Sequence, residues 1–255
     1  MTESVAEPRG ARIPGVRDRL IVALDTPDLS SALAHVDRLG DSILWYKIGL
    51  QLFCAAGRQA ILAIAERKKR IFLDLKLHDI PATVERAVRA LEGLPVSFLT
   101  IHASGGPEML AAAVAAARSP GSSLRLLGVT MLTSLDGTEI PALWSRETDL
   151  TAKVLALARL SAESGMDGVI ASPLELESLR ERHPAPFLIV TPGIRSGEVA
   201  KDDQKRTLSL PEAFARGADY VVVGRPILQA PDPAAVLASY EAAVARHRSN
   251  ERTNG

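Results

Sequence analysis

Asp74-Leu-Lys-Leu-His-Asp-Ile-Pro81 follows the apolar run Ile71-Phe-Leu73, at the point where a strand pattern gives way to a helix pattern. Because side chains alternate along a strand, Asp74 and Lys76 are predicted to lie on one face, with Asp79 just beyond the strand. Charges at the end of a core strand are costly to bury unless they are paired, and they alter one another's proton affinity. The stretch therefore indicates either a structural ion pair, with Asp79 capping the next helix, or a site that carries out chemistry.

On both sides of this stretch, short aliphatic runs alternate with longer helical patterns. The predicted strands cover 20–24, 44–48, 71–75, 98–101, 124–131, 168–171, 187–190 and 220–223. The predicted helices cover about 29–39, 52–69, 81–92, 107–118, 150–164, 173–182, 211–216 and 233–246. Eight alternations in 255 residues favour an α/β fold of one domain, a (β/α)8 TIM barrel. No Gly-x-Gly-x-x-Gly follows the first strand, so a dinucleotide-binding sheet is not favoured.

Composition narrows the classes of function. The 30 basic and 30 acidic residues balance without a basic stripe, so neither nucleic acid nor an anionic membrane is an expected partner. No apolar run is long enough to cross a bilayer and no signal core precedes the first strand, so a cytoplasmic protein is expected. We expect the barrel domain at 18–248, between flexible tails at 1–17 and 249–255. The lone Cys54 cannot form an intrachain disulfide and is expected to be buried.

Charged residues gather at the predicted C-terminal ends of the first three strands, which in a barrel is the edge that carries chemistry. These residues are Asp25, Lys47, Asp74 and Lys76. Burying four charges costs several kcal/mol for each unless they compensate one another. The cluster therefore indicates a functional site more strongly than a structural ion pair.

The ends of the last two strands carry a second signal. Gly193 and Gly224 allow backbone amides to approach an anion, and Arg225 offers a planar fork suited to phosphate oxygens. Loops at these positions of a barrel commonly form a phosphate site, whereas the alternative is ordinary turn glycines beside a solvated arginine. The pattern predicts a phosphorylated small molecule with its reacting end over Asp74 and Lys76.

Two histidines carry weaker signals. His102, after the fourth strand, admits a role as a general base, although a hydrogen-bonded structural role is favoured. His78 is interpreted as structural or as a support to the charged residues. No Walker loop, zinc-protease motif or Gly-x-Ser-x-Gly motif occurs, and no metal or organic cofactor is indicated.

In combination, these residues resemble the bacterial form of the orotidine 5′-phosphate decarboxylase family. The resemblance extends from Leu20 to about Arg246. It is carried by Asp74-x-Lys76-x-x-Asp79-Ile80-x-x-Thr83, Thr133-Ser134, Thr191-Pro-Gly-Ile-Arg195, Asp203-Gln204 and Val223-Gly-Arg225-Pro226. Asp-x-Lys-x-x-Asp alone is shared with related sugar-phosphate decarboxylases and synthases, whereas the combination is specific. Ser196 stands where the family often has proline, and this change removes no catalytic group.

The resemblance implies cofactor-free conversion of orotidine 5′-phosphate to uridine 5′-phosphate in pyrimidine biosynthesis. It implies that Lys76 protonates the C6 carbanion left when carbon dioxide departs. Asp74 would lie beside the substrate carboxylate, and Lys47 would complete the charged array. Asp79 and Thr83 would enter the active site of the other subunit in a homodimer.

The resemblance also implies a set of substrate contacts. They are Asp25 and Lys47 at the ribose hydroxyls, Ser134 with Thr133 at the pyrimidine edge, Gln204 at phosphate and base, Gly224 and Arg225 at the phosphate, and Pro192 and Arg195 in the same region.

Two other functions stay open at this point. One is a magnesium-dependent sugar-phosphate decarboxylase or synthase of the same barrel superfamily, and Thr133-Ser134 and Gln204 argue against it. The other is an inactive barrel that serves as a binding scaffold. The complete charged cluster argues against that, because such a cluster is costly and has little structural purpose.

Overall fold

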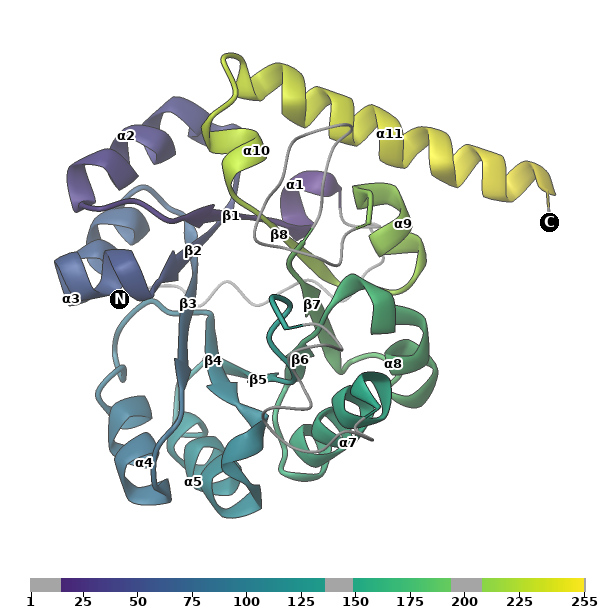
Figure 1. The fold of residues 1–255 in the computed structure, drawn as a ribbon. Helices are drawn as coiled ribbons and strands as arrows, with labels where there is room; N and C mark the ends of the chain where they lie inside the picture. Colours follow the sequence, from purple (N-terminus) through teal and green to yellow (C-terminus); the bar gives the residue numbers. More distant parts are fainter. Residues whose placement is uncertain (1–14, 136–148, 194–207, 255) are drawn as a thin grey trace.

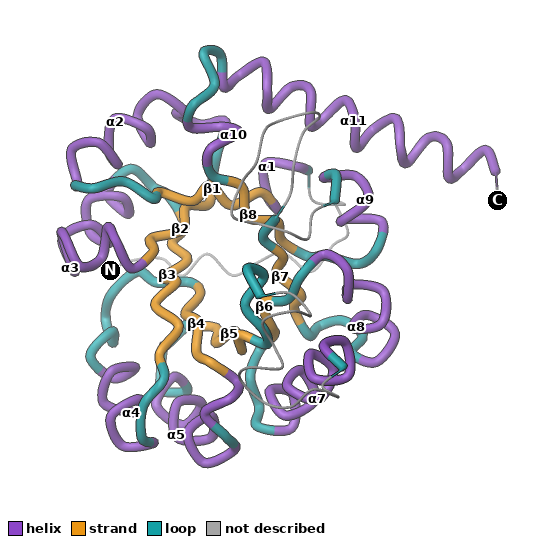
Figure 2. Tube along the Cα trace, viewed as in Figure 1, coloured by secondary structure: helices purple, strands orange, loops and turns teal. Residues whose placement is uncertain are grey.

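A computed structural model of the chain describes residues 15–135, 149–193 and 208–254. Eight parallel strands close into a barrel in chain order, with β8 pairing back onto β1 (Figure 1). The helices form an outer ring around the strands (Figure 2). The predicted (β/α)8 barrel is therefore confirmed, and the C-terminal ends of all eight strands meet at one mouth.

The strands are short. They are β1 (Leu20–Leu24), β2 (Trp45–Gly49), β3 (Arg70–Leu77), β4 (Phe98–His102), β5 (Arg125–Val129), β6 (Gly168–Ile170), β7 (Leu188–Thr191) and β8 (Tyr220–Val223). The first and last coincide with the predicted ranges, and the others differ by one or two residues at an end.

The helices are α1 (Val16–Arg19), α2 (Leu29–Leu39), α3 (Leu50–Glu66), α4 (Pro81–Arg89), α5 (Pro107–Ala117), α7 (Leu150–Glu163), α8 (Leu176–Arg182), α9 (Leu210–Ala215), α10 (Arg225–Leu228) and α11 (Pro233–Asn254). The 3-10 turns are η1 (Gly40–Ser42), η2 (Ala103–Gly105) and η3 (Pro173–Glu175). The sequence patterns missed α1 and α10, and α11 continues past the predicted end at 246. The tails predicted at 1–17 and 249–255 stay a prediction, and residues 1–14 lie outside the described residues.

Two apolar layers hold the barrel together. The larger lies between the strands and the surrounding helices, and the smaller fills the inside of the barrel. In the inner layer, Trp45 stacks on Phe98 with ring centroids 4.6 Å apart, and Phe72 and Tyr220 meet Phe98 edge-on. These rings form an apolar layer beneath the barrel mouth. A polar side chain buried above this layer must find its hydrogen-bond or ion-pair partners among neighbouring polar groups.

Cys54 is exposed on α3, so the prediction that it is buried was wrong. The buried side chains of this helix include Leu52, Ile61 and Ile64. Position 54 is two residues beyond Leu52, which turns its side chain to the opposite face of a helix.

Within the described part of the chain, no helix is both long and apolar enough to cross a membrane.

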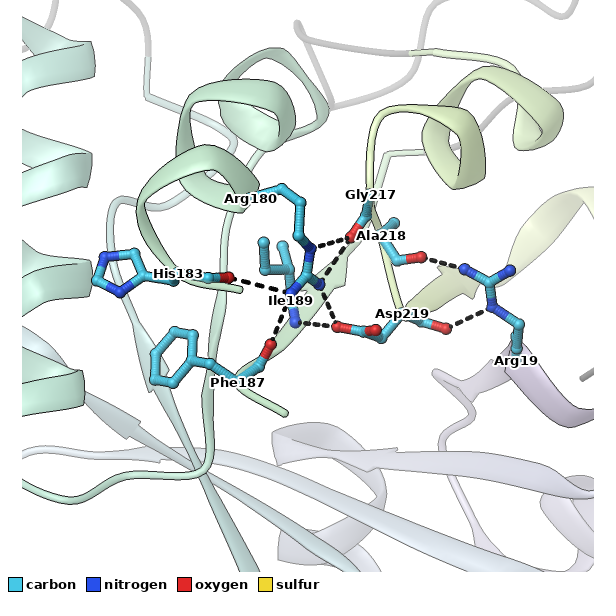
Figure 3. Close-up of polar contacts among 8 residues, drawn as sticks. All are labelled: Arg19, Arg180, His183, Phe187, Ile189, Gly217, Ala218 and Asp219. Carbon is cyan, nitrogen blue, oxygen red and sulfur yellow. Dashed lines mark hydrogen bonds and ion pairs between the residues drawn. The ribbon is translucent and has the colours of Figure 1, made fainter. Parts of the chain in front are cut away.

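Arg180 of α8 ties together the N-terminal ends of the last two strands (Figure 3). Its guanidinium donates to three backbone carbonyl oxygens, those of His183, Phe187 and Gly217. It also pairs with Asp219 Oδ2 at 2.5 Å, and that oxygen accepts the Ile189 N–H at 2.7 Å. Arg19 donates to the Asp219 carbonyl oxygen at 2.9 Å, which extends the network to α1. The network therefore links the N-terminal ends of β7 and β8 to α1, which directly precedes β1.

Arg180→Ala is expected to lower the free energy of unfolding by about 2–4 kcal/mol, because it removes the ion pair with Asp219 and, at the same time, the donor to three backbone carbonyl groups. Urea unfolding measures the change. Arg118→Ala is the matched control: Arg118 pairs with Asp167 at 2.9 Å, but its side chain is 46% exposed, against 24% for Arg180. The control is expected to lose about 1 kcal/mol or less. Equal losses in the two variants would show that the Arg180 network adds nothing beyond a surface pair.

Candidate active site

The barrel mouth holds a cavity of about 260 Å³. Eight of the residues predicted for the site line it: Asp25, Lys47, Asp74, Lys76, Thr133, Pro192, Gly224 and Arg225. They come from the C-terminal ends of six strands, and apolar side chains that include Phe72, Ile170 and Val222 complete the lining. The cavity is therefore charged on the side of β1 to β3 and apolar on its floor.

The four charged residues form one continuous chain of contacts. Lys47 Nζ lies 3.1 Å from Asp25 Oδ1 and 3.4 Å from Asp74 Oδ2. Lys76 Nζ lies 2.8 Å and 2.9 Å from the two oxygens of Asp74. The four residues predicted to gather at these strand ends do lie together. Positive and negative groups alternate across the three strands, so each buried charge has an opposite neighbour.

Burial and pairing act in opposite directions on the two most buried members. Burial alone would lower the pKa of Lys47, but the Asp74 and Asp25 carboxylates outweigh it and hold that pKa above its usual value. Burial would likewise raise the pKa of Asp74, but the ammonium groups of Lys47 and Lys76 bring it below its usual value. The cluster therefore keeps both groups ionised at neutral pH.

The backbone between Asp74 and Lys76 is not a regular strand. The register between β3 and β4 shifts between Leu73 and Leu77, and Lys76 has a φ of 50°. A positive φ is uncommon for a residue other than glycine and must be stabilised by the surrounding structure. The predicted contact between the two side chains is confirmed, but simple strand alternation is not what produces it.

Two residues that support the cluster were not assigned from the sequence. Thr100 is fully buried and contacts both Asp74 and Lys76. Gly49 ends β2, and a Cβ there would lie 3.0 Å from Lys47 Nζ and 3.2 Å from Asp25 Oδ1, so a side chain at this position would crowd both groups of this ion pair. The sequence did contain a signal for each of them: Thr100 is a polar residue inside an apolar strand, and Gly49 is a glycine at the end of a strand.

The Asp79 carboxylate does not belong to the cavity of its own barrel as far as the described residues define it. Asp79 and Thr83 are exposed, and Ile80 between them is 66% exposed. The alternative in which Asp79 caps α4 is wrong. The N-cap is Ile80, and the Asp79 carboxylate accepts only the neighbouring Ile80 N–H, at 2.7 Å, among the described hydrogen bonds.

The remaining predicted residues are placed less directly. Ser134 is exposed and lies beside the cavity-lining Thr133 without lining the cavity itself. Arg195 and Gln204 lie outside the described residues.

His102 is half-buried, and its ring lies 5.3 Å from that of His78. Burial, then the charges of His78 and Lys76, lower the pKa of His102, so the ring is neutral at neutral pH.

The end of the cavity opposite Lys76 is built from β7 and β8. Pro192 and Gly193 follow β7, and Gly193 has a φ of 85°, a conformation that favours glycine. Gly224 and Arg225 follow β8, where α10 begins. Arg225 is the cationic residue that the described part of this wall contributes to the cavity lining.

Within residues 15–135, 149–193 and 208–254, no group of three or more His, Cys, Asp or Glu side chains is arranged to hold a metal ion.

Comparison with known proteins places this geometry in a family. The model of the orotidine 5′-phosphate decarboxylase / HUMPS family matches residues 18–240. The chain belongs to this family. Orotidine 5′-phosphate decarboxylase of Moorella thermoacetica is 43% identical over 233 residues, which cover 89% of this chain and 92% of the relative. The enzyme of that name from Cereibacter sphaeroides is 47% identical over 231 residues, which cover 88% and 96%.

Solved structures of family size superpose over most of the chain. The crystal structure of orotidine 5′-phosphate decarboxylase from Lactobacillus acidophilus has a TM-score of 0.75 and 36% identity, and the match covers 90% of this chain and 99% of that one. An uncharacterised conserved protein from Geobacillus kaustophilus has a TM-score of 0.76 and 32% identity, with coverage of 88% and 99%. The family thus accounts for the barrel fold of this chain.

Proposed function

We propose that this chain converts orotidine 5′-phosphate to uridine 5′-phosphate and carbon dioxide, the decarboxylation that forms UMP in pyrimidine biosynthesis. The observation that carries the proposal is the alternating chain Asp25–Lys47–Asp74–Lys76 at the mouth of a barrel of this family. The cavity lining combines this charged chain with Gly224 and Arg225, which follow β8, and this suits a substrate with a reacting ring and a phosphate.

The chemistry requires an acid beside a carbanion. When the bond from C6 to the carboxylate breaks, the electron pair stays on C6 and carbon dioxide leaves. Lys76 then donates a proton from Nζ to C6. A preorganised ammonium about 4 Å from the developing charge contributes about 4 kcal/mol at an effective dielectric of about 20. Lys76 is held by Asp74, so it needs little reorganisation when the charge develops.

The other residues have roles in binding. Asp74 lies beside the leaving carboxylate, where like charges repel before the bond breaks. Asp25 and Lys47 bind the ribose hydroxyls, and Thr133 and Ser134 face the pyrimidine edge. Gly224, Arg225, Pro192 and Arg195 surround the phosphate, and Gln204 contacts phosphate and base. The protein requires neither a metal nor an organic cofactor, because electrostatics alone stabilise the carbanion.

We further propose that the enzyme is a cytoplasmic homodimer with shared sites and that its partners do not include nucleic acid or membrane. Asp79 and Thr83 complete the neighbouring subunit's site. Their exposure, with that of Ile80, supports this arrangement, because they stand outside the cavity of their own barrel.

A direct assay tests the function. Purified protein should decrease the absorbance of orotidine 5′-phosphate and form uridine 5′-phosphate, in the presence or absence of a chelator. Activity that disappears with chelator and returns with magnesium would favour the related sugar-phosphate decarboxylases and synthases. Binding without turnover would favour an inactive scaffold.

Arg225→Ala is expected to lower kcat/KM more than kcat, because the lost contact binds the phosphate and lies far from C6. The loss should be about 10- to 100-fold for orotidine 5′-phosphate, as for a hydrogen-bonded charge contact. It should be much smaller for orotidine, which has no phosphate. Arg216→Ala is the control. Arg216 Nε pairs with Glu177 Oε1 at a distance of 3.5 Å, and Arg216 does not line the cavity. Equal losses on both substrates would place Arg225 outside the phosphate site.

A further inference from the structure

The Thr100 side chain joins Asp74 and Lys76, the two charged residues near the C-terminal end of β3. Its hydroxyl donates to Asp74 Oδ1 at 2.9 Å and accepts the backbone N–H of Lys76, also at 2.9 Å. Thr100 is fully buried, and it is not among the residues that line the described cavity. The hydroxyl therefore lies behind the catalytic pair and is placed to act through it, without touching substrate.

The position of Thr100 follows from the barrel. Phe98 and Thr100 point inward from β4, because side chains alternate along a strand, and Leu99 and Ile101 pack in the outer core. Phe98 belongs to the aromatic floor, so Thr100 lies one layer above it. Phe72 and Asp74 occupy the same two layers on β3. In this second layer, the Thr100 hydroxyl meets the Asp74 carboxylate and the backbone of Lys76.

The irregular backbone of β3 creates the need for this residue. Where the register shifts between Leu73 and Leu77, the strand ladder does not supply the Lys76 N–H with a regular partner. A buried N–H without an acceptor is costly, and Thr100 provides the acceptor. The same contact holds Lys76 at its positive φ of 50°.

The two hydrogen bonds also fix the direction of the hydroxyl. Since Oγ1 accepts from Lys76, its single proton is free to be donated to Asp74. A hydroxyl that donates to a carboxylate favours its ionised form, and it adds to the effect of Lys47 and Lys76 on this group. The Thr100 side chain thus holds both the backbone of Lys76, the proton donor, and the carboxylate of Asp74.

We infer that Thr100 is a positioning residue for decarboxylation: it holds the β3 bulge so that the Lys76 ammonium and the Asp74 carboxylate face the reacting carbon together. The inference rests on the proposed function for its kinetic consequence, but the hydrogen bond to Lys76 can be tested without substrate.

The decisive comparison is Thr100→Val, which keeps the shape and removes the hydroxyl, with Thr100→Ser, which keeps the hydroxyl. Thr100→Val is expected to lower kcat about 10- to 100-fold, as for loss of a hydrogen bond to a charged group, with a much smaller change in KM. Hydrogen exchange of the Lys76 amide should be faster in Thr100→Val than in wild type. Thr100→Ser should recover most of the kcat and normal exchange.

Ser161→Ala controls for the loss of a buried hydroxyl as such. Ser161 is fully buried on α7 and donates to the Leu157 carbonyl oxygen at 2.9 Å, away from the cavity. This variant should lose stability and keep kcat. A folded Thr100→Val enzyme with kcat within about twofold of wild type would overturn the inference, as would a Thr100→Ser enzyme as impaired as Thr100→Val. If wild-type protein failed to decarboxylate orotidine 5′-phosphate, the proposed function would fail, and unchanged Lys76 exchange in Thr100→Val would separately refute the positioning contact.

Discussion

Lys76→Ala is expected to lower kcat by several orders of magnitude and to leave a folded protein. Lys76 Nζ is the ammonium at the cavity that is bound to both oxygens of Asp74, and it is the group we assign to protonate C6. Removal takes away both the proton donor and the charge that stabilises the carbanion, so the two losses add. Single-turnover kinetics with orotidine 5′-phosphate, beside circular dichroism of the variant, measure the effect.

Lys68→Ala is the matched control for this prediction. Lys68 also has a positive φ, 58°, so alanine meets similar backbone strain at both positions. It is exposed at the end of α3 and does not belong to the cavity. Lys68→Ala should therefore turn over at close to the wild-type rate. A folded Lys76→Ala enzyme as active as this control would remove Lys76 from the mechanism.

The barrel was predictable because its signal is local. Aliphatic runs such as Leu20–Leu24 and Tyr220–Val223 are buried on both faces, so each is readable as a strand without knowledge of its neighbours. The missed helices α1 and α10 have four residues each, too few to show a period. Cys54 was misplaced because exposure depends on which face of α3 packs inward, and composition alone does not reveal that.

The charged cluster was predictable for a different reason. Parallel strands of a barrel end at one mouth, so residues after three neighbouring strands had to meet once the fold was recognised. The support behind them depends on long-range contacts. Thr100 is 26 residues from Asp74, and the positive φ of Lys76 arises only when the two strands pair out of register. The Arg180 network has the same character, because it joins α8 to a carboxylate 39 residues away.

A large loss of activity is also expected when the residue that one subunit lends to the other subunit's site is removed. Asp79→Ala and Lys76→Ala are each expected to be nearly inactive alone, because the former removes a carboxylate lent to the neighbouring site and the latter removes the proton donor. Asp79 is exposed and outside its own cavity, which is the placement that a residue acting across a two-fold interface requires. The test is to mix the two variants, allow subunits to exchange, and measure the activity that returns.

Random pairing of two variants makes about half of the dimers hybrids. Each hybrid has one site with Lys76 from one chain and Asp79 from the other, and a second site that lacks both groups. About a quarter of wild-type activity should therefore return. Lys76→Ala mixed with Asp74→Ala is the matched control: both residues serve the same barrel, so each site of that hybrid lacks one group and no activity returns. If native mass spectrometry shows Asp79→Ala and Lys76→Ala hybrids while activity stays at the level of this control, Asp79 does not act in the neighbouring site.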